Sequence, residues 1–214
     1  MTGPRVQAAG VQAAGAQAAG VRVAGALSAG VQAVGGRQPG AGHPFRVRRA
    51  GPADREALTL MFERCTPETR YRRFHGPVKG IPERYLADAL SGSPFHYALV
   101  GYVLVGKALV GCPEAALTRE PGGTRIVALA SCRTVNEGAA ELGVLIEDAW
   151  QRRGLGTRLI GDLAAHAAGA GLRVLEAQLL AEQAWIAGLL RPHGTCRLRS
   201  TWDGVLDVTV RLAP

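Results

Sequence analysis

Aromatic residues make up only 5% of this 214-residue sequence, and no long run of Lys and Arg is interleaved with them. Proteins that bind single-stranded nucleic acid stack bases on aromatic side chains along a basic groove, so nucleic acid is an unlikely partner. Acidic residues are also in the minority, because 25 Lys and Arg stand against 17 Asp and Glu, a formal charge of +8. A charge of this sign favours an acidic partner, which can be nucleic acid, a membrane surface or an acidic ligand.

The four cysteines lack the spacing of a zinc or redox motif. No two of them form Cys-x-x-Cys, and the sequence therefore predicts no metal site. Cys112 and Cys132 lie in or beside apolar runs, which is typical of inert buried thiols. Free cysteines of this kind predict a cytoplasmic protein.

Residues 1–44 differ in composition from the rest of the chain. Glycine recurs at every fifth position from Gly10 to Gly35, in Gln- and Ala-rich pentads whose period fits neither collagen, nor a coiled coil, nor a solenoid. A segment with so few large apolar side chains cannot bury enough surface to offset its ordering entropy, so we expect it to be disordered. It is too rich in Gln and Gly to span a membrane and lacks the apolar core of a signal peptide.

From Phe45 onward the sequence predicts one domain of alternating strands and helices. Three helices follow the first strand, then three strands, a long helix, a strand, a weaker helix and two closing strands. The predicted strands are 45–49, 97–105, 125–135, 141–146, 174–180, 197–201 and 205–212, and the predicted helices begin near Pro52, Thr66, Pro82, Leu155 and Glu182.

The clearest functional pattern is a strand followed by a glycine-containing turn. A buried strand is predicted at Glu141–Ile146, and a turn at Gln151–Thr157 then opens the long helix. Gly154 and Gly156 allow a sharp bend and leave room for a ligand atom against the main chain. The first helical turn offers free N–H groups and partial positive charge, which bind anions. Such turns are also plain connections in many proteins, but the strand before this one favours a phosphate site.

Three arginines, Arg152, Arg153 and Arg158, surround this turn, which suits a diphosphate better than a single carboxylate. The dinucleotide fingerprint is excluded because its third glycine is replaced by Leu159, and no Gly-Lys-Ser/Thr follows. The remaining pattern, Gln-x-x-Gly-x-Gly after a strand with Ala-Glu, resembles the acyl-CoA-binding core of the GCN5-related N-acetyltransferases (GNAT). The resemblance covers about residues 45–214. It implies an α+β (α/β) GNAT fold, a mixed and mostly antiparallel sheet flanked by helices, with acetyl-CoA as co-substrate.

Glu141 is the predicted catalytic residue. Its apolar neighbours in the strand indicate partial burial, which would raise its pKa toward that of a useful base. An ammonium nucleophile must lose a proton before it attacks a thioester, and in the family the Glu of this strand is the general base, often through water. The alternative interpretation is a solvated strand carboxylate.

The resemblance also implies which residues bind the cofactor. The strand backbone would hold the pantetheine arm, and the N–H groups of the turn would hold the diphosphate. The family usually has Asn at the place of Gln183, and no tyrosine follows Tyr102, so a general acid cannot be assigned. The predicted cofactor-binding residues are Val144, Leu145, Ile146, Gln151, Arg152, Arg153, Gly154, Leu155, Gly156, Thr157 and Gln183.

The segment Thr66–Phe74 is similar to a segment of bacterial Pat-type protein lysine acetyltransferases. That similarity implies an acetyl-CoA-dependent N-acetyltransferase whose acceptor is a primary amine of a protein lysine. Two alternatives stay open, a small-molecule amine acetyltransferase and a catalytically weak acyl-CoA-binding module. His75 and His96 flank the expected acceptor side and receive no role, since a lone histidine is usually a packing residue.

Deleting residues 1–44 tests the domain assignment. Because the pentad segment has little to bury, the truncated protein should keep its melting temperature and its acetyl-CoA affinity. Thermal denaturation and calorimetry would measure both quantities. A drop of many degrees would show that the segment packs on the domain.

Overall fold

The computed structural model describes residues 45–104, 123–201 and 204–213. All of them belong to one compact unit, Pro39–Pro214. The predictions for residues 1–44 and for Cys112 fall outside the described residues. None of the described helices is both long enough and apolar enough to cross a membrane.

The described chain forms a seven-stranded sheet in the order β1-β2-β3-β4-β5-β7-β6. All neighbouring strands are antiparallel except β4 and β5, which are parallel and are joined through the long helix α4. The strands are β1 (Arg46–Arg49), β2 (His96–Leu104), β3 (Thr124–Asn136), β4 (Ala139–Ile146), β5 (Val174–Leu180), β6 (Gly194–Ser200) and β7 (Val205–Leu212), and the α-helices are α1 (Arg55–Arg64), α2 (Pro67–Phe74), α3 (Glu83–Leu90), α4 (Leu155–Gly169) and α5 (Ala187–Leu190).

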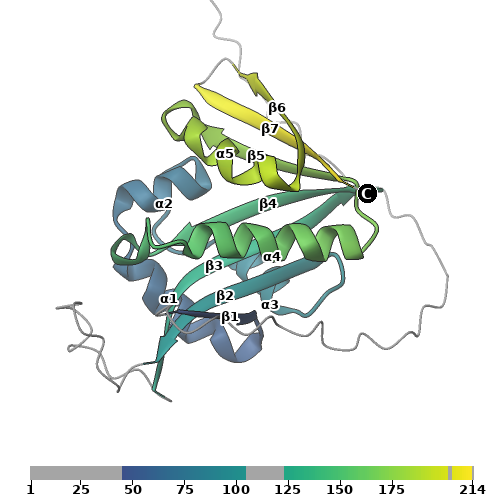
Figure 1. Ribbon diagram of the computed structural model, residues 1–214. Coiled ribbons are helices and arrows are strands. Elements are labelled where there is room, and N and C mark those ends of the chain that lie inside the picture. The colour runs from purple at the N-terminus through teal and green to yellow at the C-terminus, as the bar shows by residue number, and fades with distance from the viewer. Residues whose placement is uncertain (1–44, 105–122, 202–203, 214) are drawn as a thin grey trace, which may run out of the picture. The chain divides into compact units, whose positions relative to one another are not determined.

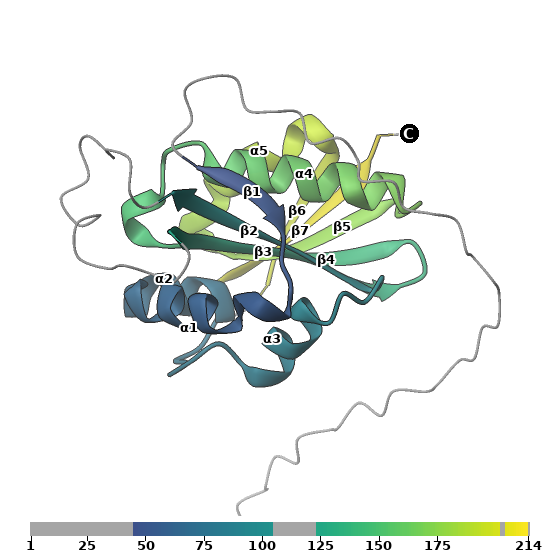
Figure 2. The same cartoon turned by 90° about the horizontal axis from the view of Figure 1, so that it is seen from below.

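Helices cover both faces of the sheet (Figures 1 and 2). Helices α1, α2 and α3 lie on one face, and α4 and α5 lie on the other. Residues two apart in a strand share a face, so each strand contributes to two cores. Leu129 and Leu145 pack under α1 and α3, whereas Ala130 and Leu142 pack under α4. The predicted apolar stripe of α4 is confirmed by five buried residues, Leu155, Leu159, Ile160, Leu163 and Ala167.

Local sequence signals account for most of the element boundaries. The Thr66 hydroxyl caps α2 by accepting a hydrogen bond from the Thr69 N–H at 3.2 Å, as Thr-Pro-Glu predicts. Two segments differ from the expectation. The helix predicted at 182–190 divides into a 3₁₀ segment, Ala181–Ile186, followed by the short α5, which ends before Pro192. Strand β6 begins at Gly194 instead of 197, because pairing with β7 extends to that residue.

A buried cluster of charges fixes the end of β4. Glu147 follows the strand directly and is only 2% exposed. Its Oε2 accepts a hydrogen bond from Arg64 Nε of α1 at 3.0 Å, and its Oε1 accepts one from the buried Arg125 of β3. Arg64 also donates to the Ile126 carbonyl oxygen at 2.8 Å. The cluster therefore ties β4 to a helix and to its neighbouring strand at one point.

Glu147→Ala should destabilise the protein by about 3–5 kcal/mol, since it leaves the guanidinium of Arg125 buried without its carboxylate. Urea unfolding would measure the loss. Glu83→Ala is the matched control, because Glu83 pairs with Arg55 on the surface with 75% of its side chain exposed and should cost about 1 kcal/mol or less. Equal losses in the two variants would contradict the assignment.

Candidate acyl-CoA and acceptor cleft

Strands β4 and β5 hydrogen-bond to each other over only part of their length. The parallel register joins Ala139–Glu141 to Val174–Glu176 and then stops. Beyond Glu141 the two strands separate, as Figure 1 shows. A cleft of about 1160 Å³ occupies this opening. The edge of β4 from Leu142 to Ile146 faces the cleft without a β5 ladder partner.

Most of the predicted site residues line this cleft. They come from β4, from the turn before α4 and from the segment after β5. The lining includes Glu141, Val144, Leu145, Ile146, Gln151, Arg152, Gly154, Gly156, Thr157 and Gln183. The side chains of the two remaining predicted residues lie elsewhere. Leu155 is 1% exposed in the core under α4, and Arg153 lies over the ring of Trp150 at 5.1 Å.

The turn before α4 has the backbone that its glycines predict. Gly154 is the N-cap of α4 with φ +83°, a left-handed conformation that side chains disfavour. Gly156 is different, because a β-carbon there would meet only Ile146 Cδ1, at 3.4 Å. The packing of the protein therefore does not require glycine at position 156. A ligand beside the first turn of α4 would require glycine there, because a side chain would occupy the space that the ligand needs.

Gln151 connects three parts of the site. Its Nε2 donates to the Ile146 carbonyl oxygen at 3.0 Å and to Thr69 Oγ1 at 3.2 Å. The side chain therefore joins the end of β4 to α2. Its amide is engaged with the protein, which makes it a residue that positions the turn.

Asp148 docks the start of α2 on the same turn. It accepts hydrogen bonds from the Thr66 N–H at 2.8 Å, the Thr66 hydroxyl at 2.9 Å and the Thr69 hydroxyl at 2.7 Å. Burial alone would raise the pKa of Asp148, but these hydrogen bonds outweigh it and hold the pKa below its ordinary value. The ionised carboxylate therefore stabilises the docking of α2 at neutral pH, and this contribution is lost as the pH falls through the lowered pKa.

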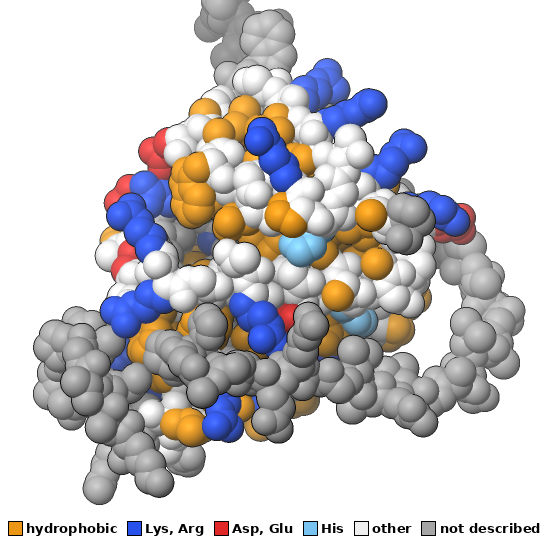
Figure 3. All heavy atoms as spheres, in the orientation of Figure 1, with side chains coloured by type: hydrophobic (Ala, Val, Ile, Leu, Met, Phe, Trp, Pro, Cys, Tyr) orange, Lys and Arg blue, Asp and Glu red, His pale blue; other side chains and the backbone are white. Residues whose placement is uncertain are grey.

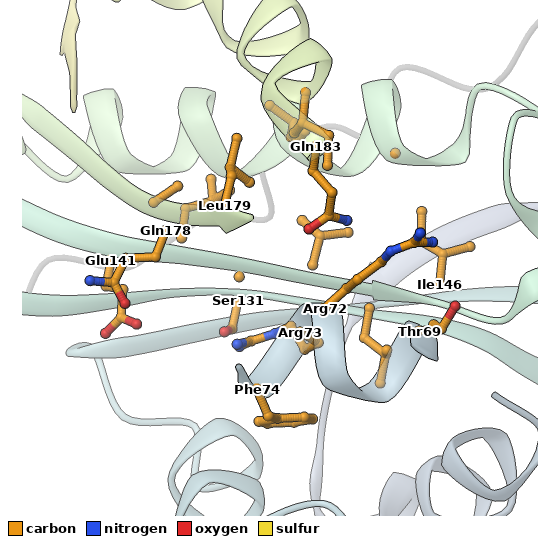
Figure 4. Close-up of a pocket in the computed structure, with 18 of the residues that line it drawn as sticks. Thr69, Arg72, Arg73, Phe74, Ser131, Glu141, Ile146, Gln178, Leu179 and Gln183 are labelled. Atoms are coloured by element: carbon orange, nitrogen blue, oxygen red, sulfur yellow. The ribbon is translucent and has the colours of Figure 1, made fainter. Parts of the chain in front are cut away.

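Glu141 lies on the face of the sheet that α1–α3 cover. It stands beside Arg133 of β3 and His96 of β2 in one row across three strands. Its Oε2 accepts a hydrogen bond from Arg133 Nη2 at 2.5 Å, and 44% of its side chain is exposed. The carboxylate thus faces the cleft, half-exposed and paired with a cation. Gln178 of β5 also lines the cleft (Figure 4).

The structure adds a second group of cleft residues to which the sequence analysis gave no role. Tyr85 of α3 is at its centre, and its hydroxyl is 2.9 Å from Ser131 Oγ of β3. Its ring lies 5.9 Å from that of Phe74 and 5.5 Å from that of His96, and the guanidinium of Arg73 lies 5.0 Å from its centroid. These residues come from two helices and two strands, so no spacing in the sequence brings them together.

Two histidines in the cleft have buried ring nitrogens that bond to no described residue. His96 is 4% exposed and both of its ring nitrogens lack a partner, as does Nε2 of His75. Burial lowers the pKa of His96, although Asp88 opposes the shift, and burial also lowers the pKa of His75. Both imidazoles are therefore neutral at pH 7, with donor and acceptor atoms in the cleft wall.

The positive charges are distributed over the surface. In Figure 3, Lys and Arg side chains of the described residues stand in several separate places on the face shown. Arg158 pairs with Asp162 at 2.8 Å on α4, and Arg72 pairs with Glu182 at 2.8 Å across the cleft mouth. Among the described residues, no cluster of His, Cys, Asp and Glu is arranged to hold a metal ion.

Known structures share this fold. The GNAT domain of Streptomyces lividans PAT is 22% identical, with a TM-score of 0.60 over 78% of this chain and 90% of that chain. The Salmonella typhimurium protein yncA, solved with its cofactor acetyl-CoA, is 17% identical with a TM-score of 0.55, over 80% of this chain and 95% of that chain. A GCN5-related N-acetyltransferase from Kribbella flavida is 17% identical with a TM-score of 0.55, over 79% and 98%. No curated protein sequence matches the chain.

The sequence itself identifies the family. The model of the Acetyltransferase (GNAT) family matches residues 82–194, which is 113 of the 214 residues. The matched segment includes strands β2–β5, the turn at Gly154 and helix α4. The strand that leaves its partner after Glu141 and the glycine-containing turn that follows it are thus parts of one recognised domain, and the chain belongs to the GNAT family of acetyltransferases.

Proposed function

We propose that this protein transfers the acetyl group of acetyl-CoA to the primary amine of a protein lysine in the cytoplasm. The GNAT family uses acetyl-CoA. The observation that carries the proposal is the separation of β4 from β5 after Glu141, which leaves a strand edge and a helix N-terminus facing the same cleft. Acetyl-CoA would use both features, the strand edge for its long pantetheine arm and the helix N-terminus for its diphosphate.

The residues present fit acetyl-CoA. Backbone groups of Val144–Ile146 on the cleft side have no partner in β5 and would bind the amides of the pantetheine arm. The N–H groups at the start of α4 would bind the diphosphate, with Arg152 and Thr157 beside them. Gln183, which also lines the cleft, would take the place of the family Asn at greater reach.

The proposed chemistry is direct transfer within one complex. Glu141 accepts the proton of the acceptor ammonium through a water molecule, and the neutral amine attacks the thioester carbonyl. Backbone N–H groups near Val144 stabilise the oxygen on which negative charge develops. CoA then leaves as the thiolate. In the free protein the Glu141 carboxylate forms an ion pair with Arg133. The ammonium group of the acceptor therefore competes with the Arg133 guanidinium for this carboxylate.

The protein lysine is supported by the Pat-like segment that forms α2, and α2 forms one wall of the cleft. The likeness to the PAT domain is at the level of the fold. A small-molecule amine would use the same chemistry. Acetylation rates measured with lysine-containing proteins and with free amines would distinguish these two acceptors. A weak acyl-CoA-binding module would bind acetyl-CoA but would acetylate neither.

Gly156→Leu tests the diphosphate site. A leucine side chain would fill the space beside the first turn of α4, so acetyl-CoA binding by calorimetry should be lost while the melting temperature changes little. Gly156→Ala is a graded control, because its β-carbon meets only Ile146 in the protein. Unaltered binding in Gly156→Leu would remove the assignment.

Glu141→Gln separates binding from chemistry. The amide keeps the shape of the side chain, so acetyl-CoA should bind as before, whereas turnover at pH 7 should fall roughly 10²- to 10⁴-fold. The loss should shrink near pH 10, where more of the acceptor amine is already neutral. Steady-state kinetics at both pH values measure this.

The control is Glu176→Gln, since Glu176 is the exposed β5 residue directly opposite Glu141 in the parallel register. That variant should keep its turnover. Equal losses in Glu141→Gln at pH 7 and pH 10, or no loss at either pH, would exclude a base and favour a solvated strand carboxylate.

A further inference from the structure

We propose that the acceptor carries a carboxylate near its reacting amine and that Arg73 is the residue that binds this carboxylate. The inference rests on the proposed function and adds the chemical class of its acceptor. The carboxylate can belong to a small amino acid or to an acidic residue beside a target lysine. The arginine recognises the same group in both.

Arg73 is placed inside the cleft by the docking of α2. It lies near the end of this helix, whose start is held by Asp148. Its guanidinium lies directly against the backbone of Gly143 in β4, where any added β-carbon would overlap it. Gly143 is two residues from Glu141 in the same strand, so both sites are on one face and about 6–7 Å apart along it.

Two aromatic rings hold the guanidinium in this position. Its central carbon lies 5.0 Å from the ring centroid of Phe74 and 5.0 Å from that of Tyr85. Arg73 is half-buried and lines the cleft. The rings fix a planar group whose N–H donors match a carboxylate in geometry, and ordering it beforehand reduces the entropy lost on binding.

Arg73 has no carboxylate partner among residues 45–104, 123–201 and 204–213. Two other arginines that line the cleft do have one, because Arg72 pairs with Glu182 and Arg133 with Glu141. Arg84 and Arg152 also line the cleft without a carboxylate partner among the described residues, but both are exposed to solvent, whereas Arg73 is half-buried. A half-buried cation left without a counter-ion in a binding cleft favours an anionic ligand.

Neutral polar groups beside Arg73 complete a carboxylate site. Ser131 is the β3 partner of Gly143, the residue that the guanidinium lies against (Figure 4), and its Oγ is 2.9 Å from the Tyr85 hydroxyl. His96, whose ring lies 5.5 Å from that of the same tyrosine, is 4% exposed, and neither of its ring nitrogens has a hydrogen-bond partner among the described residues. A buried imidazole without any partner is costly, and a bound ligand would satisfy it.

The charges on this face are complementary to an amine that also carries a carboxylate. Glu141 would receive the ammonium group, and Arg73 would receive the carboxylate about two strand residues away. An acceptor with both groups would be oriented at two points, with its amine directed toward the thioester. An amine without a carboxylate would leave Arg73 without an anionic partner. Its ammonium group would also place a second positive charge near the guanidinium.

Two matched pairs of acceptors test the proposal. One pair is 4-aminobutanoate and its carboxamide. The other is a peptide whose lysine is flanked by Asp on both sides and the same peptide with Asn. In at least one pair the wild-type protein should prefer the carboxylate by about tenfold or more in kcat/KM, the value of a charge-assisted hydrogen bond. The pair that shows the preference identifies the source of the carboxylate.

Arg73→Gln should reduce that preference to about one, through a higher KM for the carboxylate acceptor and an unchanged kcat/KM for the amide. Arg73→Lys keeps the charge without the planar donor pair and should give an intermediate ratio. Arg197→Gln, at an exposed arginine of the edge strand β6, should keep the wild-type preference. The affinity for acetyl-CoA should not change in any of the three.

Gly143→Ala provides an independent route to the same result. Its β-carbon would displace the end of the Arg73 side chain, which is flexible, so the domain should fold while the carboxylate preference falls. This variant moves the guanidinium without removing it.

A binding measurement keeps this test separate from the proposed activity. Calorimetry of the CoA-saturated protein with each acceptor pair needs no turnover, and the carboxylate member should bind more tightly to wild type than to Arg73→Gln. Equal binding of both members in both pairs would overturn the proposal even if acetyl transfer occurs. An Arg73→Gln variant that loses acetyl-CoA binding would also overturn it, because the arginine would then serve the cofactor.

Discussion

The function of this domain depends on the short parallel pairing between β4 and β5. The pairing ends after Glu141 because the two strands are held by different partners. Strand β5 follows β7 along all seven of its residues. The far end of β4 is held by β3 and by the buried ion pairs of Glu147 with Arg64 and Arg125. Each strand therefore keeps its own direction, and a cleft forms where a ladder would otherwise close.

The same point on β4 organises the other wall of the cleft. Asp148, next to Glu147, holds the first turn of α2 through Thr66 and Thr69, and Gln151 joins Thr69 to the last carbonyl of the strand. The turn before α4 and the helix that carries Arg73 are thus parts of one hydrogen-bond network. A change at this junction would affect cofactor and acceptor sides together.

Two groups of opposite charge lie close together on the α1–α3 face of the cleft. Glu141 forms an ion pair with Arg133, whereas Arg73 lies against two aromatic rings and has no carboxylate partner in the part of the chain that the structure describes. Burial lowers the pKa of His96, because removal from water disfavours the charged ring, and the nearby Arg133 and Arg73 act in the same direction. A half-exposed carboxylate and a half-buried guanidinium therefore lie on one face of the sheet, and both line the cleft.

Local signals in the sequence determined the elements and the glycine-containing turn before α4. The cap at Thr66, the glycine at 154 and the apolar spacing of α4 depend on residues only a few positions apart, and the structure confirms them. Glu141 and the turn were likewise found from one continuous segment. Tertiary structure alone decided that Arg73, Tyr85, Ser131 and His96 meet, because strand register and helix docking bring them from four separate elements. It also decided that β4 and β5 part after three residue pairs, since that separation results from contacts of each strand with different neighbours.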